Sequence, residues 1–150
     1  MMYQQNGPKE KPPWGRKRKL TTVEGIGENY ARQLRVAGIA TTEALLGAGS
    51  SPQGRAEVAA RTGISGKLIL EWVNHVDLFR IKGVGEEYSD LLEEAGVDTV
   101  PELAQRNPAN LYEKLKVTNE EKELVRKLPS EGQVADWVKQ ATALPRIIEY

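Results

Sequence analysis

Two stretches of the chain carry nearly the same sequence. Residues 24–46 read EGIGENYARQLRVAGIATTEALL, and residues 82–104 read KGVGEEYSDLLEEAGVDTVPELA. At a constant offset of 58 residues, nine positions are identical. These pairs are Gly25/Gly83, Gly27/Gly85, Glu28/Glu86, Tyr30/Tyr88, Leu34/Leu92, Ala37/Ala95, Gly38/Gly96, Thr41/Thr99 and Leu45/Leu103. Self-similarity of this kind indicates an internal repeat.

The similarity resumes further along with a shifted offset. EWVNHVDLF from Glu71 parallels DWVKQATAL from Asp136, which places Trp72 opposite Trp137. The shift implies a short insertion in the second copy. We therefore divide the chain into a basic N-terminal arm (residues 1–19), a first unit (20–80), a second unit (81–145) and a C-terminal tail (146–150).

Within each unit the spacing of apolar residues is helical. Tyr30, Leu34 and Ala37 fall at i, i+4 and i+7, and the second unit repeats this spacing. Gly38 and Gly96 stand where a left-handed residue would end a helix. Further helix starts are predicted from N-cap residues, some in capping boxes and some followed by proline. These are Ser51-Pro52, Thr99 with Glu102, Asn107-Pro108, Thr118 with Glu121, and Ser130 with Gln133.

Strand signals are almost absent, and only residues 146–150 could be extended. We predict an all-α fold with roughly four or five short helices in each unit. Short helices bury little apolar surface individually, so we expect the units to share a core and pack as one compact body. Trp72 and Trp137 are predicted to lie in that core. His75 is interpreted as a surface or partly buried structural residue of a helix over about residues 66–79.

Each unit opens with a Gly-apolar-Gly hairpin that leads into a helix. The glycine pairs, Gly25 with Gly27 and Gly83 with Gly85, are expected to permit a tight turn that a β-branched residue would strain. The residue between each pair, Ile26 or Val84, is expected to fill the space between the flanking helices. The second glycine leads into a helix N-terminus, where free backbone N–H groups can bind an anion such as phosphate.

With these hairpins the sequence resembles the helix-hairpin-helix family, whose hairpins grip the nucleic-acid backbone without reading sequence, often with a bound monovalent cation. The later Ser-Pro-Gln-Gly-Arg and Thr-Gly-Ile-Ser-Gly-Lys-Leu-Ile-Leu-Glu-Trp-Val stretches extend the resemblance to about residues 20–145. Over that range the chain is similar to a bacterial family of duplicated helix-hairpin-helix domains catalogued as a domain of unknown function. The resemblance implies a SAM-like, helix-hairpin-helix type of fold, and it allows a monovalent cation at a hairpin.

Opposite charges are divided unevenly along the chain. Of 150 residues, 21 are Lys or Arg and 21 are Asp or Glu, so the formal net charge is zero. Residues 1–20 nevertheless sum to +5, and the remainder sums to −5. The arm is rich in proline and glycine and poor in apolar residues, so we expect it to be disordered when unbound. It is either a solubilising leader or an anchor for a polyanion, in which Trp14 could stack on a base or lie at a membrane interface.

The two hairpins are surrounded by different charges. The helix after the first hairpin carries Glu28 but also Arg32 and Arg35, whereas the helix after the second is strongly acidic and would repel phosphate. We predict that the nucleic-acid-binding residues are Gly25, Ile26, Gly27, Arg32, Arg35, Arg16, Lys17, Arg18 and Lys19, and we interpret Gly83, Val84 and Gly85 as structural. The second unit's acids, Glu86, Glu87, Asp90, Glu93 and Glu94, form either a solvated helix face or a docking surface for a basic partner, including this chain's own arm.

The leading hypothesis is a non-enzymatic, sequence-nonspecific nucleic-acid-binding protein, monomeric or weakly dimeric, with DNA favoured over RNA. The alternative is a protein-interaction adaptor that uses the acidic second unit. The chain has no cysteine and one histidine, and no catalytic constellation or metal site is marked by spacing, so we expect no enzyme activity and no resident metal or cofactor. No apolar run approaches the roughly 18 residues of a membrane span, and no signal core is visible, so we expect a cytoplasmic protein.

Overall fold

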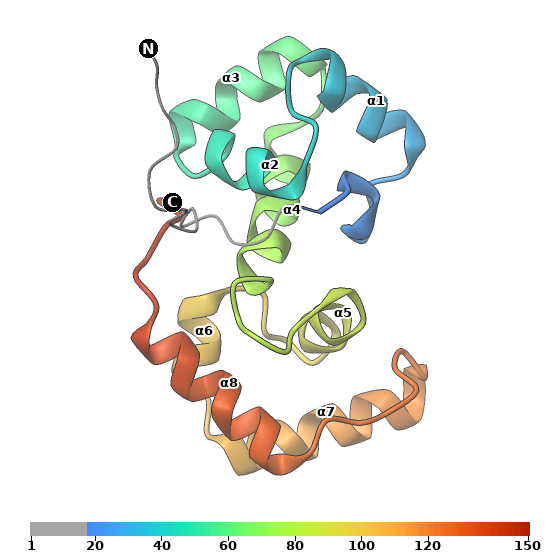
Figure 1. Ribbon diagram of the computed structural model, residues 1–150, viewed down its shortest axis with the longest axis vertical. Coiled ribbons are helices and arrows are strands. Elements are labelled where there is room, and N and C mark those ends of the chain that lie inside the picture. Colours follow the sequence, from blue (N-terminus) through green and yellow to red (C-terminus); the bar gives the residue numbers. More distant parts are fainter. Residues whose placement is uncertain (1–17) are drawn as a thin grey trace, which may run out of the picture.

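The computed structural model describes residues 18–150, and within this range every regular element is helical (Figure 1). A short 3₁₀ helix, η1 (Leu20–Thr22), precedes eight α-helices. They are α1 (Glu28–Val36), α2 (Thr42–Ala48), α3 (Pro52–Thr62), α4 (Gly66–Leu78), α5 (Glu86–Glu94), α6 (Val100–Ala104), α7 (Pro108–Lys122) and α8 (Glu131–Ala143). Lys19 and Thr41 form an isolated antiparallel bridge, and residues 18–150 contain no strand. The all-α prediction is confirmed.

Helices α1–α4 form one half of the molecule and α5–α8 form the other (Figure 1). The helices start largely where the sequence signals predict. Ser51 and Asn107 cap α3 and α7 ahead of a proline, and Thr99 and Ser130 form complete capping boxes with Glu102 and Gln133. The box predicted at Thr118 is wrong. That residue is buried inside α7, where its hydroxyl donates to the Lys114 carbonyl at 2.7 Å and so leaves the helix unbroken.

The hydrophobic core is divided between the two halves. One cluster runs from Leu20 to Phe79 and contains Trp72, and the other runs from Leu78 to Ala141 and contains Trp137. The prediction of one shared core is therefore wrong, although both tryptophans are buried as predicted. The halves meet where the end of α4 contacts α5 and α6, and polar side chains such as His75 and Asp77 fill part of this junction.

In both units a tryptophan packs on the first glycine of the hairpin. A Cβ added to Gly25 would lie 3.2 Å from Trp72 Nε1, and one added to Gly83 would lie 3.1 Å from Trp137 Nε1. Both glycines also have φ of +95°, which disfavours any residue with a side chain. The second glycines differ from the prediction: Gly27 and Gly85 have φ of −86° and −108° with open space around them. Only the first glycine of each pair is conformationally required.

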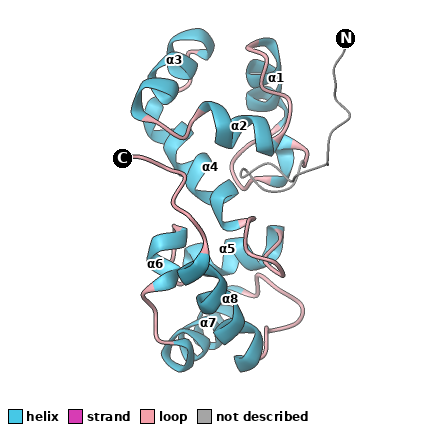
Figure 2. Cartoon of the chain, turned by 60° about the vertical axis from the view of Figure 1, so that its left-hand side comes forward, coloured by secondary structure: helices cyan, strands magenta, loops and turns pink. Residues whose placement is uncertain are grey.

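Residues 145–150 form an extended strap that returns from the second unit to the first (Figure 2). Ile148 is buried in the first unit's core, and the Glu149 N–H donates to the Ser50 carbonyl at 2.7 Å. Arg55 Nη2 donates to the Glu149 carbonyl at 2.8 Å, and the Tyr150 hydroxyl donates to Asn74 Oδ1 at 2.8 Å. The predicted tail is thus a structural part of the first unit.

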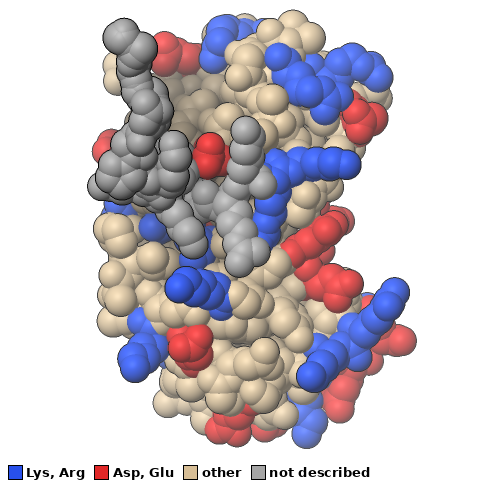
Figure 3. All heavy atoms as spheres, viewed as in Figure 1, with Lys and Arg blue, Asp and Glu red and all other residues tan. Residues whose placement is uncertain are grey.

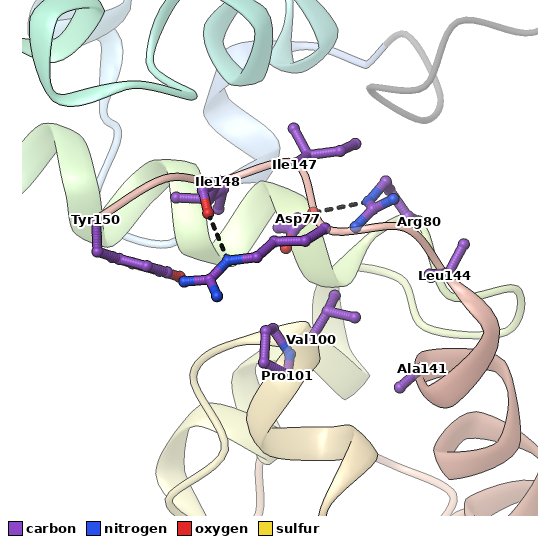
Figure 4. A pocket seen from close by; sticks show the side chains of 10 residues that line it. Asp77, Arg80, Val100, Pro101, Ala141, Leu144, Ile147, Ile148 and Tyr150 are labelled. Atoms are coloured by element: carbon purple, nitrogen blue, oxygen red, sulfur yellow. Dashed lines mark hydrogen bonds and ion pairs between the residues drawn. The ribbon is translucent and has the colours of Figure 1, made fainter.

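The strap covers a pocket of about 230 Å³ between the ends of α4, α6 and α8 (Figure 4). At its edge the buried Asp77 and Arg80 side chains form an ion pair at 2.7 Å, and Arg80 also donates to the Pro145 carbonyl at 3.0 Å. Burial raises the pKa of Asp77, while Arg80 opposes that rise. The pair therefore anchors the beginning of the strap to α4.

Candidate nucleic-acid interface

The first hairpin presents an open helix N-terminus. Ile26 is buried beneath the turn, and its N–H donates to the Val23 carbonyl at 3.0 Å. Gly27 is the N-cap of α1 and has no side chain to accept from the first turn, whose first intrahelical bond runs from the Ala31 N–H to the Gly27 carbonyl. Glu28, Asn29 and Tyr30 of this first turn are exposed residues. The N–H groups of a helix's first turn have no partner within the helix, and the helix dipole favours an anion beside them.

Basic side chains converge on this helix start. Arg35 donates to the Glu28 carboxylate at 2.8 Å, and this contact, with lesser contributions from Arg32 and Lys19, lowers the pKa of Glu28. Figure 3 shows Lys and Arg side chains gathered over the region of α1. Glu28 therefore pairs, within the chain, with an arginine whose charge we predict a phosphate would use.

The predicted binding residues are only partly brought together. Lys19, Arg32 and Arg35 act on the same carboxylate, but the Arg18 guanidinium lies over the Phe79 ring, 4.5 Å from its centroid. The charge of Arg18 is thus directed toward the end of α4. Arg16 and Lys17 lie outside the described residues.

One basic residue of this region was missed by the sequence analysis. Arg61, in the last turn of α3, donates from Nη1 to the Ala37 carbonyl at 3.0 Å, which places a guanidinium at the end of α1. Its position near a helix C-terminus is visible in the sequence, but its proximity to α1 depends on how the helices pack.

The second hairpin has a similar backbone and a different environment. Gly85 caps α5, and Glu86 and Glu87 occupy its first turn. Asp90 and Glu93, which correspond to Arg32 and Arg35, are half-buried beside His75 of α4. The interpretation of these two acids as a solvated face is therefore wrong, because α4 packs against this side of α5.

His75 is more deeply buried than predicted. Its side chain is 3% exposed, and its Nε2 lies 2.9 Å from Ser89 Oγ and 3.4 Å from Asp90 Oδ1. Burial lowers the pKa of His75 to about 4. The pKa of Asp90 is raised to about 7, mainly by burial and then by repulsion from the neighbouring acids Glu24, Glu93, Glu86 and Glu94. Both shifts favour neutral side chains, so this contact joins a carboxyl group and an imidazole rather than two full charges.

These features define a small all-helical protein built from two matching units, which differ in the charges around the first turns of α1 and α5. The chain belongs to the family described as "Domain of unknown function (DUF4332)", whose model matches residues 24–144. No curated protein and no solved structure matches the chain. Among residues 18–150, none of the helices combines the length and apolar character needed to cross a membrane.

Proposed function

We propose that this protein binds nucleic acid, DNA in preference to RNA, through backbone phosphates and without catalysis. We also infer that its two glycine hairpins are helix-hairpin-helix elements, of which the first is the binding one. The observation that carries the proposal is the uncapped first turn of α1 with Lys19, Arg32 and Arg35 around it. The proposal includes a cytoplasmic location, where such a protein meets nucleic acid.

A phosphate at this position would accept from the backbone N–H groups of Glu28, Asn29 and Tyr30. Arg35 would exchange its bond to Glu28 for one to the phosphate, and Arg32 and Lys19 would add charge. Such contacts position the backbone without reading bases, so the binding is nonspecific. Arg16, Lys17 and the rest of the arm would extend the contact along the strand.

The test is fluorescence-anisotropy binding of the full chain to short duplexes of unrelated sequence at several salt concentrations. The slope of log affinity against log salt should be about −0.9 per phosphate neutralised. The double variant Arg32→Glu/Arg35→Glu should bind every duplex more weakly. The matched control is Lys114→Glu/Lys116→Glu on exposed positions of α7. It changes the net charge by the same amount but should reduce DNA affinity less than the hairpin double variant does.

The arm is tested separately, because a basic segment alone gives salt-dependent binding. Deleting residues 1–17 should flatten the salt slope, and the hairpin double variant should weaken binding further in both backgrounds. If the double variant binds like the parent while the arm is present, the hairpin has no role in binding.

A second candidate function is a protein-interaction adaptor. It is favoured by the charge of the second unit, in which residues 81–145 hold thirteen acidic and eight basic side chains. This candidate takes precedence if hairpin charge reversal leaves DNA binding unchanged.

A further inference from the structure

The junction between the two units holds a cluster of possible metal ligands that the nucleic-acid proposal does not use. His75 projects from α4, and Asp90 and Glu93 project from successive turns of α5. One nitrogen or oxygen from each of the three side chains lies within 4.8 Å of the others. His75 Nε2 is 3.4 Å from Asp90 Oδ1, whereas Glu93 Oε1 lies 4.0 Å from the other ring nitrogen, Nδ1. Nε2 also lies 2.9 Å from Ser89 Oγ, so an ion bound to Nε2 would replace that hydrogen bond and draw the Glu93 carboxylate toward it.

One ligand atom in this cluster lacks a hydrogen-bond partner. Asp90 Oδ1 is buried and accepts no hydrogen bond from the described residues. A buried carboxyl oxygen without a hydrogen-bond partner is costly, since it loses its bonds to water and gains none in return. The neighbouring imidazole is almost completely buried, whereas the Asp90 side chain is 21% exposed with its Oδ1 atom buried.

The electrostatic surroundings also favour a cation. The charged groups that act on Asp90 are all acidic and come from both units: Glu24, Glu93, Glu86 and Glu94. Glu93 is further affected by Asp98 and by Glu71, which lies one helical turn before His75. Acidic side chains are visible in Figure 3 between the region of α1 and the region of α5. A divalent ion would relieve this mutual repulsion.

We propose that His75, Asp90 and Glu93 bind a divalent transition-metal ion, Zn²⁺ or Mn²⁺, between the two units. One imidazole nitrogen with two carboxylate oxygens is a donor set that suits these ions. The 3.4 Å between His75 Nε2 and Asp90 Oδ1 is close to the separation of about 3.3 Å for two ligands at about 2.0–2.1 Å from a tetrahedral ion. Water or a nearby carboxylate such as Glu24 would complete the coordination.

The site exists only where the first unit meets the second. The counterpart of His75 in α8 is Gln140, whose side-chain amide instead bonds both the N–H and the carbonyl of Lys82. The counterparts of Asp90 and Glu93 in α1 are Arg32 and Arg35. A bound ion would therefore join two halves whose hydrophobic cores are separate.

The experiment titrates the tag-free full chain with Zn²⁺ and follows the imidazole signals of the single histidine by ¹H–¹⁵N NMR. We expect a new set of His75 signals that is complete at one equivalent of Zn²⁺, together with a rise in thermal midpoint. Isothermal titration calorimetry gives the affinity, and the same titration with Mn²⁺ should broaden the His75 signals selectively.

The ligand variants are Asp90→Asn and Glu93→Gln, with His75→Gln introducing the residue of the second unit. Each should weaken Zn²⁺ binding by at least about 10–100-fold. The matched control, Glu113→Gln on an exposed part of α7, removes one negative charge and should leave the affinity unchanged. Circular dichroism of each metal-free variant separates lost binding from lost folding.

The proposal is overturned if the His75 signals do not respond to Zn²⁺, or if Asp90→Asn binds as tightly as the parent. Equal losses in Asp90→Asn and Glu113→Gln would also overturn it, since they would indicate general attraction to an acidic surface. If all three ligand variants misfold, the test is to add Co²⁺ to the parent chain and record its visible absorption spectrum. The absence of absorption bands from bound Co²⁺ contradicts a site with an imidazole ligand.

Discussion

Helices α1 and α5 begin in matching hairpins but face different surroundings. Both follow a left-handed glycine packed on a tryptophan, and both start at a glycine N-cap. On α1, positions 32 and 35 carry exposed arginines, one of them bound to Glu28. On α5 the same two positions carry acids that are half-buried against α4.

The two repeats share a backbone, and the surface chemistry of each differs with what packs against it. Helix α5 is covered by the last helix of the preceding unit, and no such unit precedes α1 within the described residues. Positions 32 and 35 of α1 are therefore exposed, whereas positions 90 and 93 of α5 belong to an internal junction. For this reason we expect the double variant Asp90→Arg/Glu93→Arg to disturb the packing between α4 and α5 rather than to copy the surface of the first hairpin.

The largest expected effect tests whether the hydrophobic cores of the two units are separate. Ile148→Ala should cost about 2–5 kcal/mol of unfolding free energy, because it removes a buried side chain that the strap contributes to the first core. Amide exchange should accelerate mainly in α1–α4, and denaturant unfolding gives the total loss. Glu149→Ala is the control, since its side chain is exposed while its backbone bonds remain. Equal acceleration in both halves would contradict a divided core.

The next effect tests how alike the two hairpins are. Gly25→Ala and Gly83→Ala should each cost about 1–3 kcal/mol, because both glycines have a left-handed backbone and an indole close to the added methyl group. Gly27→Ala and Gly85→Ala should each cost less than about 1 kcal/mol, since they change only an N-cap in open space. Denaturant midpoints of the four variants measure this. Large losses at the second glycines would show that these are also required.

A smaller difference in stability is expected between the N-caps of α2 and α6, the helices that follow α1 and α5. Thr99 caps α6 in a complete capping box with Glu102, whereas Thr41 caps α2 with only its own hydroxyl, because position 44 is alanine. We expect Thr99→Ala to cost about 1–2 kcal/mol and Thr41→Ala about 0.5–1 kcal/mol. Thermal unfolding monitored by circular dichroism gives the ranking, which the reverse order would contradict.

The smallest effect concerns binding and rests on the proposed function. Glu28→Gln removes the carboxylate that pairs with Arg35 and so releases this arginine for phosphate, and DNA affinity should rise by up to roughly fivefold. Glu86→Gln makes the same change at the second hairpin and should have less effect. Anisotropy at constant salt compares them. Equal gains would show that only net charge matters.

Features set by neighbouring residues could be predicted from the sequence. The repeat, the all-α fold, the N-caps at Ser51, Asn107 and Ser130, and the burial of the two tryptophans all follow from local spacing. The failure at Thr118 shows the limit of such signals. A threonine that can cap a helix can equally bond back to a carbonyl within one.

Features that join distant residues could not be predicted in this way. His75 and Asp90 belong to different units, and Arg55 bonds a residue 94 positions away. Their contacts depend on the angle at which the halves pack and on the path of the strap. The same holds at the candidate interface, where Arg32 and Arg35 are predicted from the sequence but the ion pair between Arg35 and Glu28 is not.

The strap has a consequence for synthesis on the ribosome. Translation proceeds from the N-terminus, so the α1–α4 segment emerges first, yet Ile148 is made after all of α8. The second unit's core draws on residues 78–141 and has all its side chains by then. We therefore expect that, in the nascent chain, the core of the second unit is completed before the core of the first unit, although α1–α4 emerge first.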